Sequence, residues 1–322
     1  MKKFTHAWLA FMAVKRLDKA NIPEYYGSGE SAVPIGEYAR SLVRWFMNYR
    51  DFVMQGAWYP DSVLCDQATS HGVKYEPVES DITDFRFKVL PDTMEVYNLM
   101  KAESDLYKKE FRIVKGDLCD RCEAMAHTIV DNFKILDRED KGNPLSPSSN
   151  HMAMRFFIMS HYIADAHMPL HCDARSLGKI HGEVEKQWEN YVNNTYEIDK
   201  RNSRFFYDQD GYPLMKDDQE PDPMIAAVEQ KILERPFEYG WGKEGYSTWD
   251  YMSTVTEYSY LLAYRMFPKG FKDTTWKNYS KTEEAQRFQE YCTLLMTDAI
   301  DSIARAWLHV WIRYRKWAEG NR

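Results

Sequence analysis

Apolar residues recur at three- and four-residue spacing along most of the chain, which is the pattern of helices that bury one face. The pattern predicts helices at 4–17, 35–55, 92–110, 117–137, 150–167, 181–194, 222–234, 247–266 and 282–318. Ser148, Ser149 and Asn150 are candidate N-caps for the fifth of these. Alternating runs of the strand type are few, so the sequence predicts an all-α protein.

A polar stretch from 193 to 243 departs from the pattern of a long helical core. We interpret it as an insertion or lid on the same domain, because long loops inside compact domains are uncommon and usually functional. The chain has 322 residues, of which 44% are apolar, and this is enough for a substantial core. We therefore expect one multi-helix domain that covers 1–322.

The net charge of −7 excludes a global basic field that would attract nucleic acid or anionic membranes. No run approaches the roughly 18 apolar residues of a membrane span, and no small-residue cleavage site follows the N-terminal apolar run. We expect a cytoplasmic protein.

Five cysteines make an odd, sparse set that suits a reducing compartment. We interpret Cys119 and Cys122 as two thiols on a helix.

The stretch HYIADAHMPLH concentrates three histidines and an aspartate near a helix end. His161 and Asp165 are four residues apart, so both project from one face of the helix. His167 lies about 200° around the helix from Asp165 and should point elsewhere. Because Pro169 cannot continue the helix, the chain turns there, and His171 can fold back toward the same face.

A second pair at helical spacing, His181 and Glu185, follows ten residues later. Upstream, Asp61 and His71 stand in a segment with Pro and Gly that we expect to be loop, and His6 lies near the chain start. Mixed imidazole and carboxylate donors without a thiolate cluster suit zinc better than calcium.

These motifs resemble the zinc-dependent phospholipase C family and the related fungal single-strand-specific nucleases. SHYIADAHMPLH keeps the family pattern H-x-x-x-D, with a further histidine six residues later that follows Pro-Leu. HGEVE, WYPD and the SH that contains His71 are weaker matches. The resemblance implies a mostly helical fold, a trinuclear zinc cluster and phosphodiester hydrolysis.

The ligands follow from the resemblance, residue by residue. One zinc would be held by Asp61, His71, His161 and Asp165. A second would be held by His171, His181 and Glu185. The third would be held by His6, the shared Asp165, and the amine and carbonyl of the first residue, which here is Met1 instead of the family's tryptophan. Asp61 is also a candidate proton acceptor.

Three Zn²⁺ and three carboxylate ligands would leave the cluster at about +3, which would attract phosphate despite the negative net charge. Zinc also lowers the pKa of bound water to roughly 7 and so supplies hydroxide at neutral pH.

The substrate is less well defined. The nuclease branch carries a Gly-Gly-Asn element where this chain has CDARSLGKI, and Glu185 matches the phospholipase branch. Ser62 replaces an aromatic of choline-binding members, although Trp58, Tyr59 or Tyr75 could substitute for it or belong to the core. We expect a small phosphodiester or phospholipid substrate, with transient contact to a membrane surface, in preference to nucleic acid.

Two alternatives remain open at this point. One is a single-strand nuclease or nucleotidase of the same fold. The other is a non-catalytic helical protein with a structural metal site, although such sites are usually closed, four-coordinate and often thiolate-rich.

Overall fold

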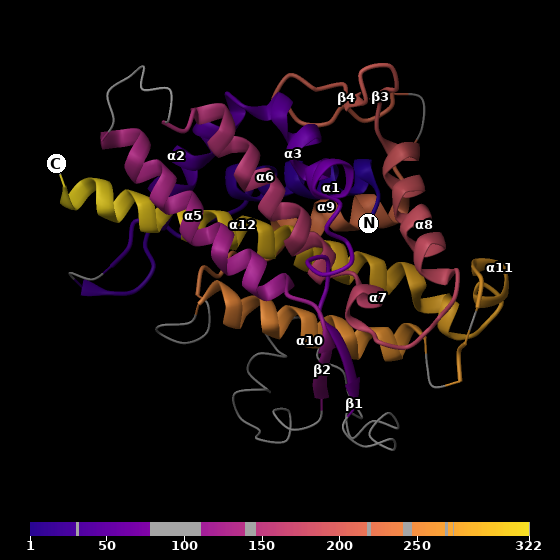
Figure 1. Cartoon of the computed structure of the whole chain (residues 1–322). Coiled ribbons are helices and arrows are strands. Elements are labelled where there is room, and N and C mark those ends of the chain that lie inside the picture. The colour runs from indigo at the N-terminus through magenta and orange to yellow at the C-terminus, as the bar shows by residue number, and fades with distance from the viewer. Residues whose placement is uncertain are drawn as a thin grey trace.

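The computed structural model describes residues 1–29, 32–77, 111–138, 146–217, 220–240, 247–267, 270–272 and 274–321. It is mostly helical, as the apolar pattern predicts (Figure 1). The main helices are α1 (Lys3–Lys19), α2 (Ile35–Met47), α3 (Val53–Tyr59), α5 (Leu118–Arg138), α6 (Ser149–Ala166), α8 (Ile180–Thr195), α9 (Pro223–Glu234), α10 (Thr248–Met266) and α12 (Phe288–Gly320). The short helices are α7 (Pro169–Cys172) and α11 (Trp276–Tyr279).

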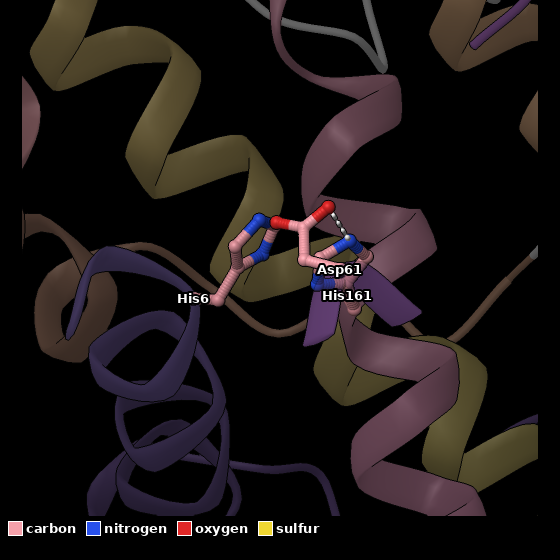
Figure 2. A group of neighbouring side chains, drawn as sticks. All are labelled: His6, Asp61 and His161. Atoms are coloured by element: carbon pink, nitrogen blue, oxygen red, sulfur yellow. Dashed lines mark ion pairs between the residues drawn. The ribbon is translucent and has the colours of Figure 1, made fainter. Parts of the chain in front are cut away.

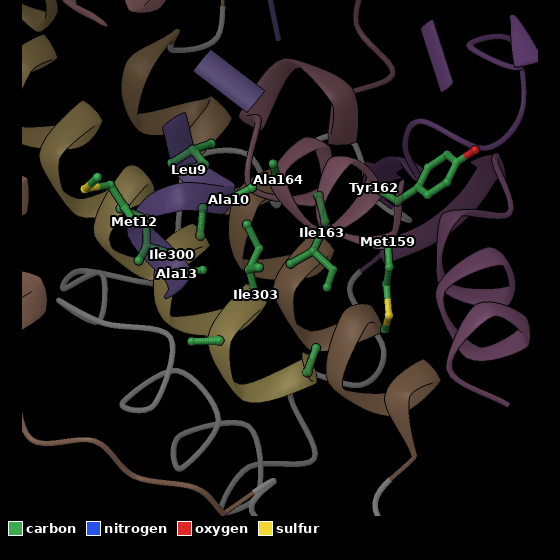
Figure 3. Packing of buried hydrophobic residues seen from close by; sticks show 14 of the residues in the cluster. Leu9, Ala10, Met12, Ala13, Met159, Tyr162, Ile163, Ala164, Ile300 and Ile303 are labelled. Atoms are coloured by element: carbon green, nitrogen blue, oxygen red, sulfur yellow. The ribbon is translucent and has the colours of Figure 1, made fainter. Parts of the chain in front are cut away.

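The core forms around α12, a helix of 33 residues that packs against α1, α2, α5, α6, α9 and α10. Figure 3 shows side chains of α1, α6 and α12 meeting in this core, among them Leu9, Ile163 and Ile303. Small residues such as Ala10 and Ala164, both fully buried, allow the helices to approach closely. α1 carries His6 and α6 carries His161 and Asp165, so this packing holds three of the predicted donors side by side.

The helix predicted at 35–55 is broken in the structure. α2 ends at Met47, a short 3₁₀ turn covers Arg50–Phe52, and α3 begins at Val53. Tyr49 has φ −123° and ψ 16°, which is not helical, so the chain changes direction there. The expectation that Asp61 lies in a loop is wrong. Asp61 lies on a π-helical turn, Pro60–Leu64, that extends α3.

Helix ends elsewhere follow the local sequence. Ser148 caps α6 by accepting a hydrogen bond from the His151 amide, as predicted. Ser247 and Asp250 form a capping box at the start of α10. The predicted helix at 92–110 lies outside the described residues.

The polar segment 193–243 contains the short antiparallel strands β3 (Ile198–Asp199) and β4 (Arg204–Phe205), and then α9. α9 buries Met224, Ile225, Val228 and Ile232 and packs against α1, α8 and α12. This part of the predicted insertion therefore contributes to the core.

A second antiparallel hairpin, β1 (Lys74–Pro77) with β2 (Phe111–Lys115), reaches the predicted donors through two glycines. A Cβ added to Gly116, which has φ +110°, would lie 2.0 Å from the carbonyl oxygen of Gly72. A Cβ on Gly72 would lie 2.3 Å from the carbonyl oxygen of His171. The hairpin can therefore contact the donor region this closely only because both positions lack side chains.

Within the described part of the chain, no helix has the length and apolar character that crossing a membrane requires.

Candidate metal centre

The structure brings all the predicted donors into one cluster at the N-terminal end of α1. They are Met1, His6, Asp61, His71, His161, Asp165, His171, His181 and Glu185. They come from α1, the turn after α3, the loop before β1, α6, α7 and α8. Three groups within the cluster have the spacing of metal ligands: His6 with Asp61 and His161, His71 with His161 and Asp165, and His171 with His181 and Glu185.

Asp165 lies at the centre of the cluster and is fully buried. One of its carboxylate oxygens is within 3.4 Å of three nitrogens: the Met1 amine, His6 Nε2 and His171 Nδ1. The other oxygen is 2.8 Å from His71 Nδ1 and 3.2 Å from His161 Nε2. The two oxygens therefore face different donors, which is the arrangement of a carboxylate that bridges two metal ions with one oxygen on each.

Glu185 is the second carboxylate on which nitrogen donors converge. Its Oε1 lies 3.0 Å from the Met1 amine, 3.1 Å from His181 Nε2 and 3.3 Å from His171 Nε2. The two nitrogens of His171 thus face the two carboxylates, Nδ1 toward Asp165 and Nε2 toward Glu185.

Asp61 closes the cluster on the side of α3. Figure 2 shows it beside His6 and His161, with its Oδ1 4.0 Å from His161 Nε2. The same oxygen is 3.6 Å from His71 Nδ1. The rings of His6 and His161 stack with centroids 3.8 Å apart, so His6 adjoins both the Asp61 and the Asp165 groups.

These distances and the unpaired donor atoms fit zinc. Two ligands of one tetrahedral zinc, each about 2.0–2.1 Å from the ion, lie about 3.4 Å apart. Five buried atoms of the cluster make no hydrogen bond: both ring nitrogens of His6, Asp165 Oδ2, His171 Nδ1 and His181 Nε2. Leaving a buried polar group unpaired costs about 1–3 kcal/mol. Bound cations would satisfy these atoms, so the clusters could hold metal ions.

Burial and charge set the protonation of the cluster. Burial lowers the pKa of His171 to about 4 and that of His6 well below its usual value, so both rings are neutral, the form that binds metals. Burial would also lower the pKa of the Met1 amine, but Asp165 and Glu185 outweigh it and raise the pKa to about 10. Metal binding there would require the metal to displace a proton.

α8 holds the start of α1 in place. Glu189 lies one turn after Glu185 and accepts hydrogen bonds from the backbone amides of Phe4 and Thr5 at 3.1 and 2.8 Å. It therefore satisfies amides at the N-terminus of α1 that have no partner within the helix. The same face of α8 thus positions Met1 beside Glu185.

Hydrogen bonds behind the cluster orient two of the histidines. Asp66 accepts a hydrogen bond from His71 Nε2 at 2.8 Å, which leaves Nδ1 directed at Asp165. Asp66 is itself fixed by Tyr162 and Arg121. His161 donates through Nδ1 to the Ala57 carbonyl at 2.7 Å and presents Nε2 to the cluster. Asp66 was not predicted from the sequence, because an aspartate five residues before a histidine in a loop is too common to be a signal.

Replacement of Asp66 by Asn should weaken zinc binding by about 10- to 100-fold, as is typical for a residue that orients a metal-binding histidine. The measurement is competition with a chromophoric chelator. Asp131→Asn, at an exposed aspartate of α5 that pairs with Lys134, is the matched control. Equal zinc affinity in the two variants would show that Asp66 does not orient His71 for metal.

Four other residues singled out in the sequence lie outside the donor cluster. His167 contacts Ser302 at 2.9 Å, away from the donors, as its helical position predicts. Cys119 and Cys122 are free thiols buried on α5. Tyr75 is buried and hydrogen-bonded to Thr256, so it belongs to the core.

A cavity of about 480 Å³ opens onto the donors and is large enough for a small substrate. Six of the donors line it: Met1, Asp61, His71, His171, His181 and Glu185. Trp58, Gln67 and Thr69 add an aromatic ring and polar groups to its wall. The cluster is therefore accessible to ligands from outside.

No family model, curated protein or solved structure matches this chain.

Proposed function

We propose that the protein is a zinc-dependent phosphodiester hydrolase of the phospholipase C type. The observation that carries the proposal is the position of Asp165, whose two oxygens face separate sets of nitrogen donors. A cluster of divalent cations bridged by one carboxylate is suited to holding the attacking and leaving oxygens of a phosphate ester.

In the proposed site, each carboxylate has a different role. Asp165 joins the metal positions, Glu185 with His171 and His181 completes one of them, and Asp61 completes another. When bound, zinc would supply a nucleophile from water at neutral pH and positive charge for the phosphoryl oxygens. Histidines bind metals in their neutral form, so as ligands they would leave the net positive charge of the metals unchanged.

Asp61 has the added role of proton acceptor in this proposal. Its side chain is 14% exposed and lines the cavity, whereas that of Asp165 is 1% exposed. Gln67 Nε2 donates to Asp61 Oδ1 at 3.1 Å and limits the rotation of the carboxylate. A carboxylate held at the cavity wall can receive the proton that an attacking water loses.

A nuclease or nucleotidase of the same fold remains the second candidate, because Trp58 in the cavity wall could stack a base. A purely structural metal site agrees less well with an open cavity and so many donors, since structural zinc sites are closed.

Three substrates distinguish these functions: short-chain phosphatidylcholine, single-stranded DNA and bis-p-nitrophenyl phosphate. We expect zinc-loaded protein to hydrolyse the p-nitrophenyl diester and the phospholipid, to act weakly on DNA, and to lose all activity after chelation. Metal analysis should give close to three equivalents of zinc. Preference for DNA would favour the nuclease, and one tightly held zinc with no hydrolysis would favour the structural protein.

A further inference from the structure

Among the described residues, the charged residues that line the cavity and are not predicted donors are all lysines. In the described part of the lining, the acidic residues are Asp61 and Glu185, which face the donor nitrogens. The remaining charged lining residues are Lys2, Lys74 and Lys115. Lysines at the wall favour a substrate that carries negative charge beside the cleaved phosphate.

Lys74 and Lys115 are the notable pair, since they lie directly opposite each other across β1 and β2. Like charges at opposed positions of two strands destabilise the pairing. Within the described residues, neither lysine forms an ion pair with a carboxylate. Lys74 donates to the Leu170 carbonyl at 2.5 Å, and the nearby Asp173 is occupied by Arg175 at 2.6 Å. In the part of the chain that the structure describes, no carboxylate pairs with these two charges, so a ligand can bind them.

Lys2 differs from this pair. Its ammonium lies 3.1 Å from Glu185 Oε2, so a donor of the cluster already neutralises it.

The backbone fixes the pair beside the donors. Gly72 and Gly116 place the base of the hairpin against the carbonyl of His171, with no room for a side chain at either position. Lys74 comes two residues after Gly72, and Lys115 comes directly before Gly116. Both lysines therefore line the cavity from a part of the hairpin that is packed against the donor cluster.

We propose that the substrate carries a second phosphate group next to the phosphodiester that is cleaved, and that Lys74 and Lys115 bind this group. The inference rests on the proposed function, because it assigns the cleaved phosphate to the metal cluster. Lysine binds phosphate as a compact, fully charged donor. Two lysines suit a dianionic monoester, and the source of the group is either a phosphorylated lipid headgroup or a nucleotide.

Binding to zinc-loaded protein tests the proposal without catalysis. The probes are propyl phosphate and 1,3-propanediol bisphosphate, which differ by one phosphate group, and the measurement is calorimetry. We expect the bisphosphate to bind about tenfold more tightly, as one charge-assisted hydrogen bond provides. Lys115→Ala should remove this advantage and leave the affinity for propyl phosphate unchanged, and Lys115→Arg should retain most of it.

Lys74→Met is the second variant, and Lys316→Ala, at an exposed lysine of α12, is the matched control. If the bisphosphate has no advantage, or keeps it in both Lys115→Ala and Lys74→Met, the second-phosphate site is wrong and the hydrolase proposal stands. If propyl phosphate itself does not bind, both proposals fail.

Hydrolysis distinguishes the two sources of the second phosphate. The probes are the 5′-phosphorylated dinucleotide pTpT and a short-chain phosphatidylinositol 4-phosphate, each compared with its form lacking the extra phosphate. We expect the natural class to be cleaved about tenfold faster with that phosphate, and Lys115→Ala to abolish the difference. No acceleration in either class would overturn the proposal.

Discussion

Asp165→Asn should reduce kcat/KM for bis-p-nitrophenyl phosphate by at least about 10³-fold, which corresponds to about 4 kcal/mol of lost transition-state stabilisation. An amide offers only one oxygen as a ligand, and its NH₂ group would face nitrogen donors that are themselves within 3.4 Å of the carboxylate. Metal analysis should show that the variant also loses at least one of the zinc ions that Asp165 is proposed to share.

The control must separate loss of metal from loss of fold. Asp131→Asn removes a carboxylate from an exposed position of α5 and should leave rate and zinc content unchanged. Circular dichroism of Asp165→Asn should match that of the parent, because the core around α12 does not depend on this carboxylate. A folded Asp165→Asn protein with full zinc content and near-normal rate would contradict a central role for Asp165.

The sequence was most informative where one periodicity accounts for the geometry. His161 and Asp165 share a helix face because they are four residues apart, and the structure places both in the cluster. The return of His171 to the same face follows from the stop that Pro169 imposes, and its Nδ1 does lie 3.4 Å from Asp165. His167 was correctly separated from these residues by the same reasoning.

Contacts between distant segments could not be derived in this way. The convergence of Asp61, His71 and His6 on α6 was expected only from the resemblance to a family, since no local rule connects them. The break at Tyr49 was missed because the apolar spacing continues through it and only the backbone angles change.

Residues whose role depends on their partners in the fold could not be predicted from the sequence, for a related reason. Asp66 gains its role from His71, Tyr162 and Arg121 together. The opposition of Lys74 and Lys115 depends on the register of two strands that are far apart in the sequence. A sequence read by itself gives no register for such a pair.

The position of the Met1 nitrogen makes a further prediction, for protein that begins at Met1. Its amine is buried and lies 3.1 Å from Asp165 and 3.0 Å from Glu185. One glycine added before Met1 would convert the amine into an amide, whose nitrogen has no lone pair available for a metal. It would also insert atoms where Met1 is only 5% exposed.

We therefore expect the extended protein to bind about one zinc fewer and to lose at least about 10²-fold in rate, the typical effect of displacing reacting groups by an ångström. Glycine added after Arg322 is the matched control, because the preceding Asn321 is exposed. The loss would come from the amine and not from unfolding of α1, since Glu189 holds Phe4 and Thr5 independently of Met1. If the extended protein keeps its zinc content and rate, Met1 is not a ligand, and His6 and Asp165 must bind their metal without it.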